Sequence, residues 1–402
     1  MTGLRDELHL LARQAPAVDL AERAVRGARR RRRIGLYGSA LATLVAVALG
    51  ATVLAGGLLG GAEQGTISGR VTDVLPTSGV DPLAYAYYDM CGVKWTPGKN
   101  TGEFAGKDCV QWHVVTRTGQ NFRMPEALSF YTDQSEQNYM NTAAPVAITP
   151  DGRRIAYYSE KDQRFAVRDL ASGDVRLAPQ TVSRATMVTN GGLLRLSPDG
   201  RHLGLYGFGG LDAVVDMDAG RVHEIPAGWH VHSVPDGGSP VVLVNEQDRY
   251  ALLIDGQARP FAAADVARQV SELAPDGRRV AYLTGGTPGL TSGGAQKSRP
   301  DDTIVTVDAT TGRILSRVRI RDEAERFPSW RIGGWRSPTE VVVSAAVIDR
   351  SWTASRTGRP VEGRVPTLGE TAYALDVTTG AVRRLRAYTF RGWSGDIVLP
   401  GF

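Results

Sequence analysis

His230 and His232 are the only two histidines that lie close together in the sequence. Alternate residues of a β-strand point to the same side, so both imidazoles would face one site if this segment is extended. Structural zinc sites use four protein ligands and catalytic ones use three, and the sequence identifies no partner for this pair. We therefore expect the two histidines to pack or to contact solvent, and we predict no metal site and no cofactor.

Motifs of nucleophilic and phosphate chemistry are missing from the chain. An α/β-hydrolase holds its serine in a G-x-S-x-G turn, and Gly392-Trp393-Ser394-Gly395 is one residue short of that pattern. The nucleotide-binding and calcium-loop fingerprints are also absent. We predict a protein without catalytic residues. The alternative is an enzyme, such as a lyase or a glycan-processing activity, with acids or histidines that the fold brings together.

Two stretches rich in Gly, Ser, Thr and Pro, at 284–301 and 349–369, interrupt β-rich sequence. They carry the residues that we predict to form a ligand-binding surface: Lys297, Arg299, Arg350, Trp352, Arg356 and Arg359. Long loops on a rigid scaffold commonly carry binding residues, and an aromatic side chain beside arginines is typical of an interface anchor. The alternative is that both stretches are tolerated insertions without a ligand.

A repeated phrase predicts the scaffold of these loops. Pro-Asp-Gly-Arg begins at Pro150, Pro198 and Pro275, and a decayed copy begins at Pro235. Pro presets the second position of a tight turn, Asp bonds its own backbone, and Gly takes the positive-φ position. We expect each Asp to cap its turn rather than to bind calcium. A period near 40 residues built from short strands is typical of a β-propeller.

A second mark, from Asp to Gly, follows each phrase, for example at 169–173, 216–220 and 308–312. We interpret the phrase as the turn between strands one and two of a blade, and the second mark as the turn between strands three and four. Both insertions then connect strands two and three of neighbouring blades. They would lie side by side on the face opposite the turns.

We predict an all-β fold with six blades. Units beginning near Val146, Leu193, His230, Val270 and Ser329 give five of them. The sixth combines the region before Val146 with residues 390–402, which removes the open sheet edge. Seven blades are the alternative, because residues 66–124 are long enough for a blade of their own.

The phrase also carries a family resemblance. Ser197-Pro198-Asp199-Gly200-Arg201 and the segment from Thr149 to Tyr157 resemble the WD40-like repeat of TolB-type propellers, over roughly residues 146–388. This resemblance implies a fold and no activity. The Gly-His and Trp-Asp pairs of true WD40 repeats are absent, so a eukaryotic-style adaptor is not supported. The preference for Arg over Lys indicates a GC-rich genome, as in high-GC Gram-positive bacteria.

Residues 34–61 contain no charged side chain and are long enough to cross a hydrocarbon core of about 30 Å. Five arginines precede this stretch: Arg29, Arg30, Arg31, Arg32 and Arg33. A basic block of this kind stays in the cytoplasm. We predict a helical cytoplasmic tail at 1–33, a single transmembrane helix at 34–61 and an extracytoplasmic propeller at 62–402. The alternative is a cleaved signal peptide, whose apolar core is usually shorter.

The net charge of the whole chain is +5, and the first 33 residues account for all of it. We therefore expect no nucleic-acid partner, and we expect the tail arginines to contact anionic lipid headgroups. The tail resembles the cytoplasmic segments of anti-sigma-like membrane proteins, without the His-x3-Cys-x2-Cys pattern of the zinc-binding members.

Two cysteines, Cys91 and Cys109, follow the apolar stretch. In an oxidising compartment such a pair predicts a disulfide, and two free thiols are the alternative. Taken together, the sequence predicts a non-catalytic, membrane-anchored propeller that binds a protein or cell-envelope ligand outside the cell. The competing hypothesis is a transmembrane regulator whose tail holds a cytoplasmic partner.

Overall fold

The computed structural model describes residues 73–89, 94–95, 102–103, 111–128, 144–190, 192–260, 270–284, 303–321, 330–348, 367–389 and 394–402. The chain divides into two compact units, Met1–Leu59 and Gly60–Phe402, and every described residue belongs to the second. The predicted tail and transmembrane helix, with Arg29 to Arg33, lie outside the described residues. Among the residues that are described, no helix combines the length and the apolar character needed to span a membrane.

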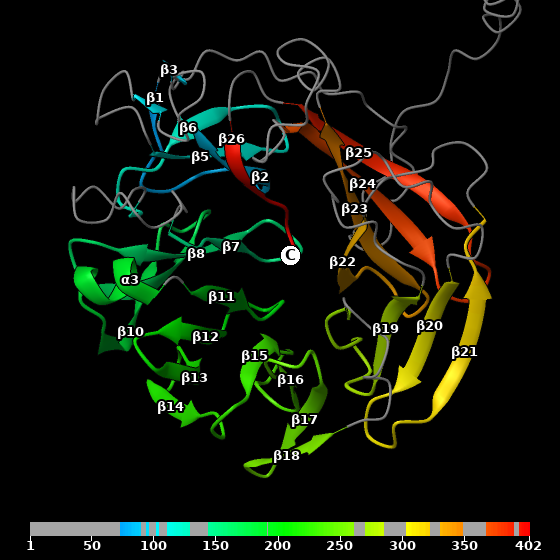
Figure 1. Cartoon of the computed structure of the whole chain (residues 1–402). Helices are drawn as coiled ribbons and strands as arrows, with labels where there is room; N and C mark the ends of the chain where they lie inside the picture. Colours follow the sequence, from blue (N-terminus) through cyan, green and yellow to red (C-terminus); the bar gives the residue numbers. More distant parts are fainter. Residues whose placement is uncertain are drawn as a thin grey trace, which may run out of the picture. The chain divides into compact units, whose positions relative to one another are not determined.

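Six β-sheets follow one another around a common axis (Figure 1). Blade one contains β1 (Asp73–Val74), β2 (Leu83–Asp89), β5 (Gln111–Thr116), β6 (Asn121–Arg123) and β26 (Ser394–Val398). Blade two contains β7 (Ala147–Ile148), β8 (Arg154–Ser159), β9 (Arg164–Asp169) and β10 (Val175–Thr181). Blade three contains β11 (Leu193–Leu196), β12 (His202–Phe208), β13 (Leu211–Asp216) and β14 (Arg221–Glu224).

Blade four contains β15 (His230–Ser233), β16 (Val241–Val244), β17 (Tyr250–Ile254) and β18 (Gln257–Pro260). Blade five contains β19 (Arg279–Thr284), β20 (Thr303–Asp308) and β21 (Ile314–Arg319). Blade six contains β22 (Trp330–Trp335), β23 (Glu340–Ile348), β24 (Thr367–Asp376) and β25 (Val382–Thr389). A short helix, α3 (Arg184–Asn190), and a hairpin of β3 (Lys94–Trp95) and β4 (Gly102–Glu103) complete the described elements.

The predicted blade boundaries are confirmed, with one difference in blade five. Its innermost strand is reduced to a single bridge between Val270 and Tyr282. The phrase Pro-Asp-Gly joins the first and second strands in blades two, three and four, and the second mark joins the third and fourth. Because both kinds of turn are set by local backbone chemistry, their positions followed directly from the sequence.

The turn glycines of two blades also touch the preceding blade. Gly152 and Gly200 have positive φ angles of 76° and 69°. A Cβ on Gly152 would lie 2.3 Å from the carbonyl oxygen of Leu83 in blade one, and a Cβ on Gly200 would lie 2.5 Å from Cδ of Arg154 in blade two. Glycine is needed there both for the turn conformation and for the approach of adjacent sheets.

The ring closes through the mixed blade, and the seven-blade alternative is wrong. Strand β26 pairs with β2, so strands from both ends of the described chain share the sheet β1-β6-β5-β2-β26. Beyond β26, the N–H of Gly401 donates to the carbonyl of Ile148 in blade two, and its carbonyl accepts from the N–H of Gly334 in blade six, both at 3.0 Å. The last residues therefore tie the closing blade to both of its neighbours (Figure 1).

The hydrophobic core lies between successive blades, so most second and third strands are apolar on both faces. In β8, Ile155 packs with the cluster shared with blade one, while Ala156 and Tyr158 pack with the cluster shared with blade three. In that second cluster the rings of Phe165 and Phe208 lie 4.7 Å apart. This arrangement explains the unbroken apolar runs that follow each phrase in the sequence.

Candidate functional site

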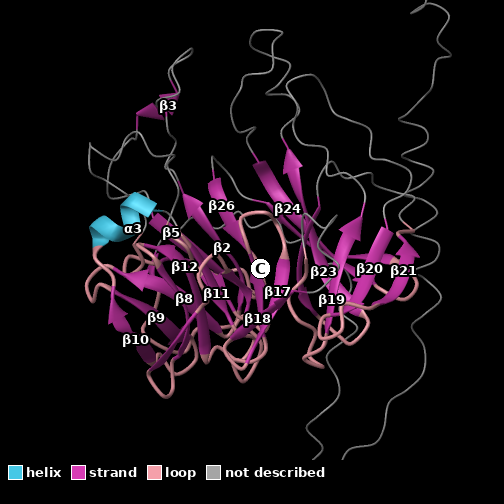
Figure 2. Ribbon diagram, turned by 60° about the horizontal axis from the view of Figure 1, so that its bottom comes forward, coloured by secondary structure: helices cyan, strands magenta, loops and turns pink. Residues whose placement is uncertain are grey.

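The two predicted binding loops begin and end on neighbouring blades. One leaves β19 after Thr284 and enters β20 at Thr303, and the other leaves β23 after Ile348 and enters β24 at Thr367. Both connect the second and third strands, at the ends opposite the Pro-Asp-Gly turns, as the spacing predicted. Figure 2 shows most of the short turns gathered at the other ends of the strands. The second insertion is shorter than expected, because β24 already begins within the stretch 349–369.

The binding residues predicted from the sequence lie in these two connections, outside the described residues: Lys297, Arg299, Arg350, Trp352, Arg356 and Arg359. Cys91 and Cys109 lie outside them as well, on either side of the β3–β4 hairpin in the sequence. Their roles therefore stay predictions, while the strand ends that carry the insertions are part of the described structure.

His230 and His232 face opposite sides of blade four, contrary to the prediction from their spacing. The register of β15 against β16 shifts beside His232, and a bulge of this kind breaks the alternation of side chains. The ring of His230 lies 4.0 Å from that of Tyr206 in blade three. His232 Nε2 lies 2.7 Å from the carbonyl oxygen of Val270, towards blade five. The two imidazoles therefore cannot share a metal ion.

A different set of ionisable residues comes together on the inner segments of three successive blades. Arg195, His232 and Glu272 each lie three residues before the proline of their Pro-Asp-Gly phrase, in blades three, four and five. All three side chains are half-buried. We call this set the axial cluster. The periodic phrase was the signal that could have found it, had the positions before each proline been compared from blade to blade.

Arg195 and Glu272 influence each other without touching. The negative charge of Glu272 favours the charged form of Arg195, although burial lowers the pKa of Arg195 overall. The positive charge of Arg195 favours the charged form of Glu272 in the same way. Among the described residues, the buried Nε of Arg195 has no hydrogen-bond partner, and no ion pair within 4.0 Å joins the two side chains.

The carboxyl group of Glu272 lies over the backbone of blade six. A Cβ on Gly334 would be 2.7 Å from its Oε2, and the amide of Glu272 donates to the carbonyl of Gly333 at 3.3 Å. Burial raises the pKa of Glu272 to about 7, with Asp236 adding to the rise and Arg195 opposing it. The group is therefore balanced between its acid and carboxylate forms near neutral pH.

His232 is neutral over the same range. Burial, together with the nearby charge of Arg195, lowers the pKa of His232 to about 4, against hydrogen bonds to the backbone of Val270 and Ser271. Because a carbonyl oxygen only accepts, the neutral ring carries its proton on Nε2. The axial cluster thus combines a fixed cation, a neutral imidazole and a carboxyl group that titrates near pH 7.

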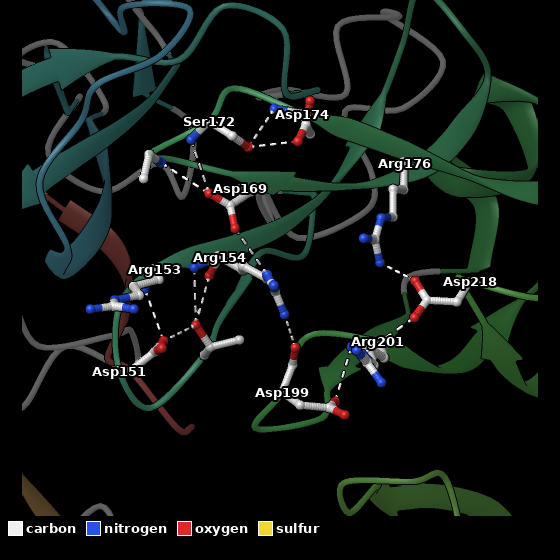
Figure 3. A network of polar contacts seen from close by, with 12 residues as sticks. Asp151, Arg153, Arg154, Asp169, Ser172, Asp174, Arg176, Asp199, Arg201 and Asp218 are labelled. Carbon is white, nitrogen blue, oxygen red and sulfur yellow. Dashed lines mark hydrogen bonds and ion pairs between the residues drawn. The ribbon is translucent and has the colours of Figure 1, made fainter.

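A second polar network joins blades two and three on the turn face (Figure 3). Nε of Arg154 donates to Oδ2 of Asp169 at 3.2 Å, and its Nη1 donates to the carbonyl of Asp199 in the next blade. Asp218 pairs with both Arg176 and Arg201. A groove of about 390 Å³ beside this network is lined by three acidic and three basic residues, Asp151, Asp169, Asp199, Arg153, Arg154 and Arg201, so its formal charges balance. We assign the network to blade-to-blade cohesion.

The turn aspartates cap their own turns, as expected. Oδ1 of Asp151 accepts from the amide of Arg153 at 2.9 Å, and Oδ1 of Asp169 accepts from the amides of Ala171 and Ser172 at 3.1 Å. Although burial acts to raise it, these amide bonds and Arg154 hold the pKa of Asp169 below its ordinary value. The carboxylates are therefore engaged by backbone donors.

Comparisons with known proteins show likeness of fold only. The chain is similar in structure to TolB from Acinetobacter baumannii, with 15% identity, a TM-score of 0.39 and coverage of 81% of this chain and 67% of that one. A protein assigned as TolB from Agrobacterium tumefaciens gives 16% identity, a TM-score of 0.39 and coverage of 62% and 83%. Hydrazine synthase of Kuenenia stuttgartiensis gives 14% identity, a TM-score of 0.36 and coverage of 63% and 69%.

No family model matches the sequence, and no curated protein matches it. TolB proteins are among the solved structures that the chain resembles, in line with the turn phrase. Likenesses this distant bear on neither activity nor ligand. The six-bladed propeller is established by the strand order of the chain itself.

Proposed function

We propose that this chain is a non-catalytic binding protein whose propeller holds a protein or cell-envelope ligand outside the cell, without a nucleic-acid partner. One observation carries the proposal. The two long insertions start from neighbouring blades on one face, at Thr284 and Ile348, whereas the opposite face is made of short turns capped by their own aspartates. Two neighbouring blades thus carry long connections whose sequences contain basic residues and Trp352, the residue types of a binding surface.

The binding proposal is tested with full-length chains that carry a photo-crosslinking residue in place of Trp352. Irradiation of intact cells is expected to give one defined crosslinked product. The matched control carries the same residue at Ala219, in a turn on the opposite face, and is expected to give none. Substitution of Arg350, Arg356 and Arg359 by Gln should abolish the product. An identical product from both positions would contradict the proposed face.

The proposed location rests on the apolar stretch 34–61 and the arginines before it. Protease added to intact cells should remove the propeller and leave a membrane-embedded fragment that contains residues 1–33. Survival of the propeller would overturn the orientation. The competing regulator hypothesis requires that residues 1–33 capture a cytoplasmic protein, which a pull-down with this tail tests independently of the propeller.

A second candidate function gains support from the axial cluster. A lyase or other glycan-processing enzyme needs a proton acceptor whose pKa lies near the working pH, and burial raises the pKa of Glu272 to about 7 beside Arg195. Incubation of the full chain with acidic polysaccharides would release unsaturated products if it is a lyase. The substitution Glu272→Gln should then stop the release, and an unchanged rate would exclude Glu272 as the acceptor.

A further inference from the structure

We propose that the outer edge of blades five and six binds a linear phosphodiester polymer along a row of arginines. The outermost strands of these blades, β21 and β25, lie on the outside of the ring (Figure 1). The arginines that we call the outer row lie on these strands or just after β21: Arg317, Arg319, Arg321, Arg383, Arg384 and Arg386. All of them are exposed except Arg386, which is half-buried.

The two strands meet end to end, so the outer row continues from one blade to the next. Arg321 and Ala381 form a parallel bridge, and the amide of Arg321 donates to the carbonyl of Gly380 at 2.7 Å. A Cβ on Gly380 would clash with the carbonyl oxygen of Arg319. From Ala381 the chain runs on in the direction in which β21 ends. The row is therefore one surface shared by two blades.

Packing fixes which side of β21 carries the charges. Val318 and Ile320 pack against the apolar cluster shared by blades five and six. Because side chains of a strand alternate, Arg317, Arg319 and Arg321 point the other way, where they are exposed. Alternate residues of a strand lie about 7 Å apart. The strand thus presents separate charges in a line rather than a group of donors around one anion.

Most of the outer row has no acidic partner within the described residues. Neither 309–321 nor 381–389 contains an acid. Arg383 pairs with Glu340 at 3.1 Å. By contrast, the residues described around Arg317, Arg321 and Arg384 offer them no ion pair.

Three acids follow the end of β21 in the sequence and lie outside the described residues: Asp322, Glu323 and Glu325. With Glu340 they make four acids against the six arginines of the outer row, so an excess of positive charge remains. An excess of this kind attracts polyanions.

Protection of the sheet edge does not explain the outer row. Charged residues on an outer strand commonly prevent edge-to-edge pairing. The outermost strands of blades two, three and four carry one arginine each, Arg176, Arg221 and Arg259. Two of these pair with an aspartate. One arginine per edge therefore suffices elsewhere in the ring, whereas β21 carries two and β25 carries three.

The spacing of the outer row indicates the ligand. A peptide has three backbone bonds and spans about 3.5 Å per residue. A phosphodiester polymer of three-carbon units has six backbone bonds per repeat, so one repeat spans about 7 Å by the same measure. That length equals the separation of alternate arginines on a strand. Arginine also binds phosphate oxygens through two parallel hydrogen bonds.

Two other phosphate-bearing partners match the outer row less closely. Single-stranded nucleic acids stack their bases on aromatic side chains, and no aromatic side chain is exposed within the described residues 309–321 and 381–388. Membrane binding grows with the apolar area that is buried, and the exposed large apolar side chains of β21 are Ile314 and Leu315. Two side chains supply little area, and we assign the row to a polymer.

The outer row gives a ligand class to the binding propeller proposed above, and it rests on the proposed location outside the cell only for the source of the polymer. It uses the described outer strands and not the two insertions. The crosslinking experiment at Trp352 can therefore fail while the row binds, and the reverse is equally possible.

Binding of fluorescent poly(glycerol phosphate) to the full chain in a neutral detergent, followed by anisotropy, tests the proposal. Arg317→Gln, Arg321→Gln and Arg384→Gln together should raise the dissociation constant more than tenfold at about 50 mM salt. They should also lower the slope of log affinity against log salt by about 2, since each neutralised charge of a single strand contributes about 0.7.

The matched control removes the same charge from exposed arginines of blades two and four: Arg153→Gln, Arg249→Gln and Arg259→Gln. Affinity and slope should stay unchanged in this control. The arginines at 29–33 are present in every variant and do not affect the comparison. Thermal melting checks folding, and if a triple variant fails to fold, each single substitution in the outer row should lower the slope by about 0.7.

Equal effects of the two triple variants would overturn the proposal, because net charge alone would then explain the loss. Unchanged binding in the outer-row variant would overturn it too, as expected if the acids at 322–325 neutralise the row. Glycerol phosphate monomer that competes as well as the polymer, at equal phosphate concentration, would contradict a row of separate contacts. Tighter binding of single-stranded DNA, or binding of phosphatidylglycerol vesicles that depends on the row, would overturn the assignment to this polymer.

Discussion

The carbonyl of Gly152 accepts a hydrogen bond of 2.8 Å from the amide of Leu83, and a Cβ on Gly152 would lie only 2.3 Å from the carbonyl oxygen of Leu83. The turn of blade two is thus pressed against the first residue of β2. By contrast, Gly277 occupies the same turn position with a similar φ of 67° and has open space around it. At Gly277 glycine is required only by the positive φ of the turn, whereas at Gly152 it is also required by the close approach of blade one.

Replacing Gly277 by Ala should cost about 1 kcal/mol, the penalty of a side chain at positive φ. Replacing Gly152 by Ala should cost that amount and about 2 kcal/mol more, because a backbone atom must move. Chemical denaturation of both variants gives the two values. Equal losses would show that the interface between blades one and two accommodates the added methyl group at no cost in the free energy of unfolding.

Asp308 and Asp376 cap equivalent turns, but within the described residues only Asp308 also binds an arginine. Both accept from the amides of the two threonines that follow, and Arg278 adds a bond of 2.6 Å from its Nε to Asp308. Asp308→Ala should therefore destabilise the protein by about 1 kcal/mol more than Asp376→Ala, as expected for a partly exposed ion pair. Arg278→Gln should remove that difference and is measured in the same denaturation series.

Glu272 and His232 make opposite contributions to the pH dependence of stability. The folded state raises the pKa of Glu272 from 4.5 to about 7. The contribution of Glu272 to the free energy of unfolding therefore falls as the pH rises from 4.5 to 7. The folded state lowers the pKa of His232 from 6.5 to about 4. The contribution of His232 to the free energy of unfolding therefore falls as the pH falls from 6.5 towards 4. Between pH 4.5 and 6.5 the two effects oppose each other.

Single substitutions should expose each contribution. In Glu272→Gln, the free energy of unfolding should rise with pH between 4.5 and 6.5, because the contribution of His232 is then no longer opposed by that of Glu272. In His232→Gln, it should fall with pH between 4.5 and 7. Each slope is at most about 1.4 kcal/mol per pH unit. Denaturation at several pH values checks both signs, and matching slopes in the two variants would refute the assignment.

Removal of residues 394–402 should prevent stable closure of the ring. The deletion takes away β26 and leaves the edge of β2 unpaired at Ala86, Tyr87 and Asp89, and an exposed edge promotes aggregation. Removal of residues 401–402 alone keeps the ladder but loses the Gly401 bonds to both neighbours. We expect aggregation for the longer deletion and a lower but cooperative melting transition for the shorter one, by light scattering and thermal melting.

Cys91 and Cys109 should be oxidised in the exported protein. A thiol reagent under denaturing conditions should find no free sulfhydryl before reduction and two after it. Loss of the bridge in Cys91→Ser should cost about 3 kcal/mol by the chain-entropy estimate for a loop of this size. Two reactive thiols in the unreduced protein would mean that the bridge is absent.

The sequence by itself determined the repeat, the turns and the places of the insertions. Pro, Asp and Gly act within four residues, so the turns at Asp151 and Asp199 could be located without knowing their surroundings. The period of these turns predicted the blades. Because the repeats supplied only five complete units, the last residues of the chain were predicted to complete a sixth blade, which β26 does. The apolar runs identified strands covered on both sides.

Only the tertiary structure decided which residues meet between blades. A single extra residue in β15 turned His232 away from His230, and no local pattern revealed that bulge. Arg195 and Glu272 are far apart in the chain and approach because successive sheets stack around an axis. Contacts of this kind depend on the rotation and separation of whole blades, which are set by packing in the core rather than by any short stretch of sequence.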